Sequence, residues 1–155
     1  MVELLLSELI KKGYDFYTGV PCSLLISFFN YIYANPSKLT YVSGLREDTA
    51  VGISAGAYLA GKKPAILMQN SGFGSSINAI TSLLLPYDIP VFFIIGYRGY
   101  QGKDTEENKG MGALTEKLLA DLDIPYLFLQ KSSVNEIMDF LIVNSSKSRA
   151  LLITE

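Results

Sequence analysis

The chain has 155 residues, with 13 lysine and arginine residues against 15 aspartate and glutamate residues, and it contains no histidine. An apolar fraction of 49% excludes a disordered chain, and a net charge of −2 gives no basic surplus for binding a nucleic-acid backbone. Without histidine, this chain cannot supply a Ser-His-Asp triad, a Cys-His pair or an HExxH zinc site, so catalysis would need carboxylates, Lys, Arg, Tyr or a cofactor.

The first residues predict an amphipathic helix. Val2, Leu5, Leu6 and Leu9 share one helical face, and Gly13 can end the helix. The apolar run is too short and too acidic for a secretory leader. The chain also has no uninterrupted apolar stretch of about 18 residues, so we expect no membrane partner and a cytoplasmic protein.

Strands and helices alternate along the rest of the chain. The continuous apolar run Ile89–Ile95 is typical of a central strand that is covered on both faces. Ser133 and Glu136 match a capping box at the start of a helix. Strands are predicted at 15–20, 39–43, 64–68, 89–95, 125–129 and 150–154. Further helices are predicted at 25–35, 47–60, 75–85, 112–122 and 134–142.

This alternation predicts an α/β fold: one domain with a doubly wound, six-stranded parallel sheet and helices on both faces. Ligands bind such sheets at the carboxyl ends of the strands. The loops that follow strands are therefore the candidate sites. They are Gly19–Ser23, Gly44–Asp48, Gln69–Ser76 and Gly96–Met111.

Each of these loops has a structural and a functional interpretation. Gly19–Ser23 can be a plain turn between strand and helix. Glu47 and Asp48 can simply complement a helix dipole, or one of them can be a partly buried carboxylate that transfers a proton. Arg98 follows the central strand, where a guanidinium could hold an anionic substrate, but the same loop can also be a solvated surface. Neither GxGxxG nor GxxxxGK[ST] occurs in the sequence.

Five segments, taken together in chain order, form a pattern known from one enzyme family. They are TGVPCSLL (Thr18–Leu25), REDTAVGISAGAYLAGKKP (Arg46–Pro64), LMQNSGFGSSINAITSL (Leu67–Leu83), IGYRG (Ile95–Gly99) and GMG (Gly110–Gly112). This pattern resembles the pyrimidine-binding domain of thiamine-diphosphate-dependent decarboxylases. The branch it resembles contains phosphonopyruvate decarboxylase and the alpha subunit of sulfopyruvate decarboxylase.

The resemblance implies roles for individual residues. Glu47, which opens a helix of small residues, is similar to the family's catalytic glutamate, which hydrogen bonds to the aminopyrimidine ring of thiamine diphosphate. The turn formed by Gly19, Val20 and Pro21 is expected to lie near the same ring. Asn70 and Ser71 match the family's substrate-side loop. Arg98 is expected, on charge alone, to help hold a phosphonate or sulfonate.

The segment Gly96–Met111 is expected to be a long lid loop, and here the sequence departs from the family. Phosphonopyruvate decarboxylases carry D-E-P-Q-H in the lid, whereas this chain has Asp104-Thr-Glu-Glu-Asn108. Asn108 cannot act as an acid or base at neutral pH. The sequence therefore leaves the substrate open between 3-phosphonopyruvate, 3-sulfopyruvate and another 2-oxo acid.

The family's Gly-Asp-Gly motif, which binds diphosphate and magnesium, does not occur in this chain. The resemblance thus implies a single pyrimidine-binding domain over residues 1–155, with no metal ligand of its own. A separate beta subunit is expected to carry the diphosphate-binding domain and to bind Mg²⁺. The implied function is the alpha subunit of a 2-oxo acid decarboxylase that releases CO2 and an aldehyde. The alternative is a non-catalytic Rossmann-like or flavodoxin-like binding or regulatory subunit.

Overall fold

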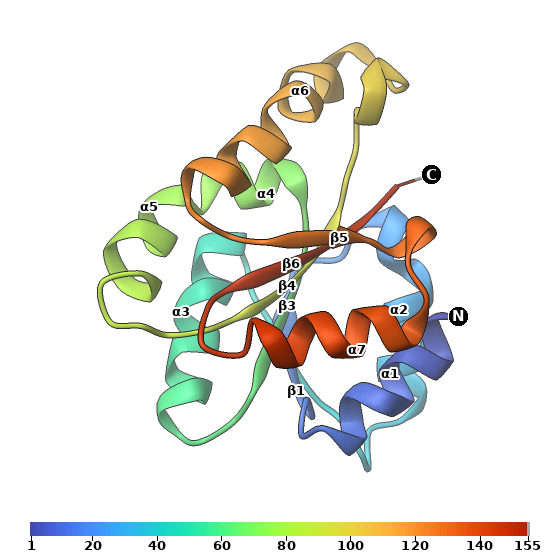
Figure 1. The fold of residues 1–155 in the computed structure, drawn as a ribbon, viewed down its shortest axis with the longest axis vertical. Coiled ribbons are helices and arrows are strands. Elements are labelled where there is room, and N and C mark those ends of the chain that lie inside the picture. Colours follow the sequence, from blue (N-terminus) through green and yellow to red (C-terminus); the bar gives the residue numbers. More distant parts are fainter. Residues whose placement is uncertain (155) are drawn as a thin grey trace.

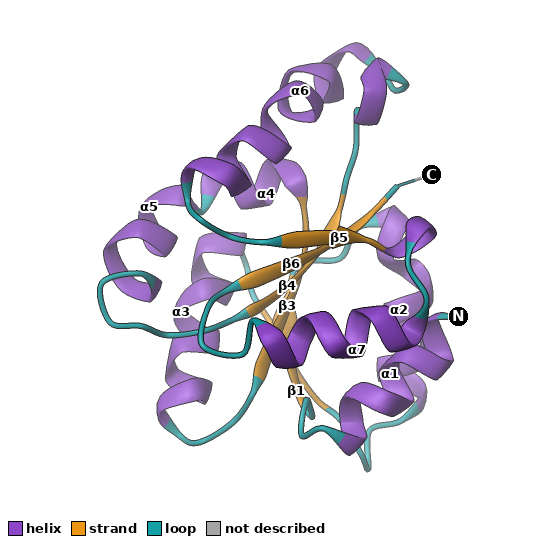
Figure 2. Ribbon diagram, in the orientation of Figure 1, coloured by secondary structure: helices purple, strands orange, loops and turns teal. Residues whose placement is uncertain are grey.

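The computed structural model describes residues 1–154 and contains a six-stranded, all-parallel sheet with the strand order β2-β1-β3-β4-β6-β5 (Figures 1 and 2). The strands are β1 (Phe16–Gly19), β2 (Thr40–Ser43), β3 (Pro64–Gln69), β4 (Phe92–Gly96), β5 (Tyr126–Phe128) and β6 (Arg149–Ile153). The helices are α1 (Val2–Lys11), α2 (Ile26–Ala34), α3 (Glu47–Leu59), α4 (Asn70–Ser75), α5 (Ile77–Ala79), α6 (Glu106–Asp121) and α7 (Val134–Val143). The predicted doubly wound fold is confirmed.

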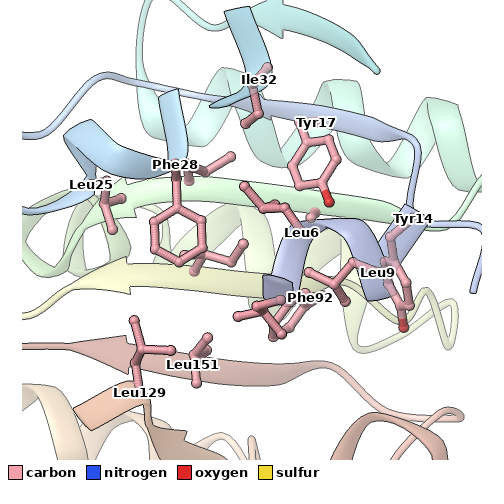
Figure 3. Close-up of a cluster of buried hydrophobic side chains, with 14 of the residues drawn as sticks. Leu6, Leu9, Tyr14, Tyr17, Leu25, Phe28, Ile32, Phe92, Leu129 and Leu151 are labelled. Carbon is pink, nitrogen blue, oxygen red and sulfur yellow. The ribbon is translucent and has the colours of Figure 1, made fainter. Parts of the chain in front are cut away.

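The two faces of the sheet carry separate hydrophobic clusters because side chains alternate along each strand. Leu67 and Phe92 face α1, α2 and α7, whereas Ile66 and Phe93 face α3, α4 and α6. Figure 1 shows these two groups of helices on opposite sides of the sheet. Figure 3 shows part of the first cluster, in which side chains of α1 and α2 meet those of the central strands. Both faces of the central strands are buried, as the apolar run at Ile89–Ile95 predicts.

The capping box at the start of α7 is also confirmed. The Ser133 amide donates to Glu136 Oε2 at 2.7 Å, and the Glu136 amide donates to Ser133 Oγ at 3.3 Å. These bonds satisfy backbone donors that the first helical turn leaves open.

The prediction of a loop at 69–74 is wrong, because α4 begins at Asn70, directly after β3. The glycines that indicated a loop sit in helical turns and allow close contacts instead. A Cβ atom on Gly74 would lie 2.7 Å from the Met111 Cε atom of α6. Gly72 lies against Glu47 in the same way. Because Gly72 and Gly74 have no side chain, α4 can lie close to α3 and α6 without losing its helical conformation.

The loop predicted at Gly96–Met111 is shorter in the structure, since α6 begins at Glu106. Acidic residues in its first turn favour a helix start there. Gly112, inside α6, packs against the backbone of Gly99, so that a Cβ on either residue would collide with the other segment. Within residues 1–154, no helix combines the length and the apolar character that a bilayer crossing requires.

Candidate functional site

The carboxyl ends of β1, β2 and β3 meet at one edge of the sheet, because β1 lies between the other two strands. The turn after β1 is pinned to β3 there, since the Val20 amide donates to the Leu67 carbonyl at 3.0 Å. Gly19 has a φ of +148°, and a Cβ on it would collide with the Leu67 carbonyl oxygen. Only glycine fits this position, so the turn that contains Val20 and Pro21 is held close against β3.

Glu47 stands at the start of α3 and faces α4. A Cβ atom on Gly72 would lie 2.5 Å from Glu47 Oε1, so the carboxyl group rests directly on the glycine backbone. The side chain is partly buried. None of the hydrogen bonds or ion pairs formed within residues 1–154 involves this carboxylate. Its oxygens therefore retain their capacity to bind a ligand.

The neighbouring acid, Asp48, is committed elsewhere. Arg46 donates to both of its carboxylate oxygens, at 3.2 and 3.0 Å, and this pairing holds the pKa of Asp48 below its usual value. Asp48 therefore matches the structural interpretation of the acids at this helix start. Glu47 is the acid of the pair that faces α4.

A short polar relay borders Glu47. The Cys22 thiol donates to Gln69 Oε1 at 3.9 Å, and Gln69 Nε2 donates to Ser71 Oγ at 2.9 Å. Burial raises the pKa of the Cys22 thiol above its ordinary value, so Cys22 is a neutral donor and not a thiolate nucleophile. Sequence reasoning missed Gln69, although its position as the last residue of β3 could have indicated it.

Arg98 follows β4 and pairs with Asp104. Its Nε and Nη2 atoms donate to the two oxygens of Asp104 at 2.6 and 2.7 Å, and Nη1 donates to Ser23 Oγ at 3.4 Å. The guanidinium holds the pKa of Asp104 well below its usual range. The contact with Ser23 places the guanidinium beside the turn that follows β1, at the same edge as Glu47.

Asn70 is fully buried and its amide is used within the protein. Its Nδ2 donates to the Arg98 carbonyl and to Thr115 Oγ1, each at 2.9 Å, and its Oδ1 accepts from the Arg98 amide at 3.2 Å. Asn70 thus joins the start of α4 to the end of β4 and to α6. Ser71, the next residue, is exposed beside the relay.

The structure therefore brings Glu47, the Gly19–Pro21 turn, Ser71 and Arg98 to one edge of the sheet, and places Asn70 beneath them. Among residues 1–154, no group of three or more His, Cys, Asp or Glu side chains could hold a metal ion. The arrangement offers the Glu47 carboxylate, the Ser71 hydroxyl and the Arg98 guanidinium, which is paired with Asp104.

Comparison with known proteins identifies the family. Residues 1–120 match the thiamine pyrophosphate enzyme, N-terminal TPP binding domain. The chain is 42% identical over 125 residues to sulfopyruvate decarboxylase subunit alpha of Methanococcus maripaludis, a match that covers 80% of this chain and 74% of that one. It is 36% identical over 123 residues to phosphonopyruvate decarboxylase of Streptomyces viridochromogenes, which covers 79% of this chain and only 31% of that protein.

A solved structure shares the fold. The thiamine diphosphate-dependent 4-hydroxybenzoylformate decarboxylase of Rhodococcus jostii superposes on 99% of this chain with a TM-score of 0.70 and 17% sequence identity. This chain spans 30% of the length of that protein. The correspondence supports the architecture alone.

Proposed function

Because the chain belongs to the family of thiamine pyrophosphate enzyme N-terminal domains, we propose that it is the alpha subunit of a thiamine-diphosphate-dependent decarboxylase acting on 3-sulfopyruvate. The preference for 3-sulfopyruvate over 3-phosphonopyruvate rests on extent of similarity. The sulfopyruvate decarboxylase subunit is 42% identical to this chain over the matched residues, whereas the phosphonopyruvate decarboxylase is 36% identical.

The observation that carries the proposal is the position of the Glu47 carboxylate. It rests on Gly72 at the edge of the sheet where β1, β2 and β3 end, and it has no hydrogen-bond or ion-pair partner among residues 1–154. This setting fits the aminopyrimidine ring of thiamine diphosphate, since a ring nitrogen can form the hydrogen bond that the carboxylate lacks. The turn Gly19–Pro21, fixed by its contact with β3, would lie against the ring. When bound, the cofactor supplies the electron sink for loss of CO2 from a 2-oxo acid. Glu47 would hold the ring and the proton at that nitrogen.

The remaining polar residues would act on the substrate. Ser71 is exposed and can donate a hydrogen bond to a carboxylate or sulfonate oxygen. Arg98 supplies positive charge at the same edge, and Asp104 fixes the direction of its guanidinium. Asn70 is a positioning residue in this proposal, because its amide is engaged with the Arg98 backbone.

A beta subunit would complete the site by supplying the diphosphate-binding domain and Mg²⁺. Two considerations support this part of the proposal: the relative matched over most of both chains is a subunit alpha, and residues 1–154 hold no metal-ligand cluster. The proposed partner would cover the edge where Glu47 lies. A non-catalytic binding or regulatory subunit would have no use for an uncommitted carboxylate at that place.

The test measures CO2 release from 3-sulfopyruvate and from 3-phosphonopyruvate, with thiamine diphosphate, Mg²⁺ and a candidate beta subunit. We expect selective activity on 3-sulfopyruvate in the mixture. Glu47→Gln should lower kcat by about 10²–10⁴-fold, because the amide cannot exchange a proton in the carboxylate's place. Activity of Glu47→Gln equal to the unmodified complex would overturn the assignment of Glu47.

Asp48→Asn is the matched control, since Asp48 is the adjacent acid and is paired with Arg46. This variant should retain activity within about twofold. Co-elution of the two subunits on size exclusion should be unchanged for both variants. A loss of the complex in Glu47→Gln would instead identify a structural role for the carboxylate.

A further inference from the structure

A cavity of about 360 Å³ lies at the opposite edge of the sheet, where the strands begin. Pro64 and Arg149, the first residues of β3 and β6, both line it. The end of α1 and the final turns of α3 and α7 form its other walls. Along β3, the step from Pro64 to Gln69 corresponds to about 17 Å at the usual rise of a strand. The cavity is thus separate from the candidate active site.

All the charged residues that line this cavity are basic. Lys12, Lys63 and Arg149 line it, and none of its lining residues is acidic. The three residues come from different parts of the chain and line one cavity only in the folded protein, where Lys63 Nζ donates to the Lys12 carbonyl at 2.9 Å. Converging cations of this kind, without a carboxylate among the lining residues, favour an anionic ligand.

Arg149 is the one buried cation among the three that line the cavity. It is only 4% exposed, and no carboxylate among residues 1–154 forms an ion pair with it. Its Nη1 donates to the Lys147 carbonyl at 2.8 Å and to the Ser145 carbonyl at 3.5 Å, its Nη2 donates to the Tyr14 hydroxyl, and its Nε finds no partner among the described residues. A buried charge with only neutral partners is costly. A bound anion would supply the missing counter-charge.

The rest of the cavity wall is apolar. Met138, Leu141 and Ile142 of α7 line one side, and the rings of Tyr14 and Tyr58 contribute on the others. Lys63 Nζ lies 5.9 Å from the centroid of the Tyr14 ring, so cationic and aromatic groups adjoin. A bare inorganic anion would leave these apolar surfaces uncovered, whereas an anion with a hydrocarbon body would bury them.

We propose that this cavity is a second ligand site, which binds a small organic monoanion that carries an aromatic or aliphatic body. Its volume lies at the lower end of the range for small-molecule sites, about 300–1,000 Å³, which suits a ligand of the size of benzoate. The anionic group lies among Lys12, Lys63 and Arg149, and the body packs on α7. This inference is independent of the proposed decarboxylase function.

The test is an NMR titration of the isotope-labelled full chain with three probes. Benzoate carries both the charge and the body, benzamide carries the body alone, and acetate carries the charge alone. We expect benzoate to shift the amides of Lys63, Ile142 and Ser145 in a saturable manner, and to bind about tenfold or more tightly than either other probe. Equal shifts with benzamide or acetate, or shifts confined to other residues, would overturn the proposal.

Two surface variants make the assignment specific. Lys63→Gln removes one cation, and Ile142→Asp places a carboxylate in the cavity wall; each should weaken benzoate binding by about tenfold. Lys38→Gln and Val143→Asp are the matched controls, because both residues are exposed and lie outside the cavity lining. Two results would exclude this cavity as the binding site. Benzoate affinity could be unchanged in Lys63→Gln and Ile142→Asp, or it could fall as much in the control variants as in these two.

Discussion

At the scale of single residues, the position of the Glu47 carboxyl group depends on the absence of a side chain at Gly72. Glu47 and Gly72 come from different helices, and the carboxyl group of the first occupies the space that a side chain on the second would fill. The position of the carboxylate is therefore set by the backbone of α4 as much as by α3. A substitution at Gly72 should consequently affect chemistry more than folding.

Gly72→Ala tests this dependence. The added methyl carbon would overlap Glu47 Cγ and would lie 2.5 Å from Glu47 Oε1, so the Glu47 side chain would have to turn away from its present position. Because Gly72 has a helical backbone and alanine favours helices over glycine by up to about 1 kcal/mol, the fold should not lose stability. We expect kcat of the complex to fall by about tenfold or more, with an unchanged or higher melting temperature.

Gly52→Ala provides the control for helix propensity, since a Cβ there would meet no atom within 4 Å. It should keep the activity of the unmodified complex. If Gly72→Ala is as active as Gly52→Ala, the activity does not depend on the contact between the Glu47 carboxylate and the Gly72 backbone.

At the scale of elements, the periodic segments could be predicted and the glycine-rich ones could not. The apolar run at Ile89–Ile95 and the Ser133 capping box each indicated their element, because burial on two faces and capping are local properties. The glycines after β3 favour a loop when the sequence is read alone, whereas in the structure Gly72 and Gly74 lie in a helix and make room for Glu47 and Met111. Such partners lie far away in sequence, so nothing local predicts them.

The contacts within the candidate site could not be predicted from the sequence either, because they also join segments that are far apart in the chain. The sequence could indicate Glu47 and Arg98 by their positions after strands. It could not show that Asp104 already binds Arg98, or that the Asn70 amide is buried against the Arg98 backbone. These are tertiary contacts between the end of β4 and the elements around it. For this reason the proposed function treats Asn70 as a residue that positions Arg98, although the sequence suggests contact with the substrate.

Asp104 joins the end of β4 to the start of α6, and this connection should depend on pH. Its carboxylate accepts from Arg98, from the Gly99 and Thr105 amides at 2.9 and 2.8 Å, and from Asn108 Nδ2 at 3.1 Å. Because these bonds lower the pKa of Asp104, their contribution to stability is complete above the usual aspartate pKa of about 4. It is lost as the pH falls further. Asp104→Asn should lower the melting temperature at pH 7. At about pH 3 the melting temperatures of the variant and the unmodified chain should lie closer together.

The control for Asp104→Asn is Asp121→Asn, which breaks an exposed ion pair with Lys117 on α6. Exposed pairs of this kind contribute about 0.5 kcal/mol or less, so this variant should melt close to the unmodified chain at both pH values. Identical melting behaviour of the two variants would mean that Asp104 is no more than a surface charge.

At the scale of the whole molecule, the two edges of the sheet have different assignments. The carboxyl edge carries Glu47, Ser71 and Arg98, and the amino edge carries the cationic cavity around Arg149. The strands of the sheet separate the two edges. If the beta subunit binds at the carboxyl edge, as the proposed function requires, we expect the cavity at the amino edge to stay accessible in the complex.

Hydrogen–deuterium exchange with and without the beta subunit measures this directly. We expect slower exchange in residues 19–23, 69–71 and 98–105, because the partner would cover the turns that surround Glu47. Exchange in residues 12–14, 61–64 and 144–149, around the cavity, should not change, and benzoate should slow it equally in the free chain and in the complex. Protection at the amino edge alone would place the partner over the cavity and contradict the proposed location of the shared active site. Protection at both edges would leave that site in place and exclude a freely accessible second ligand site in the complex.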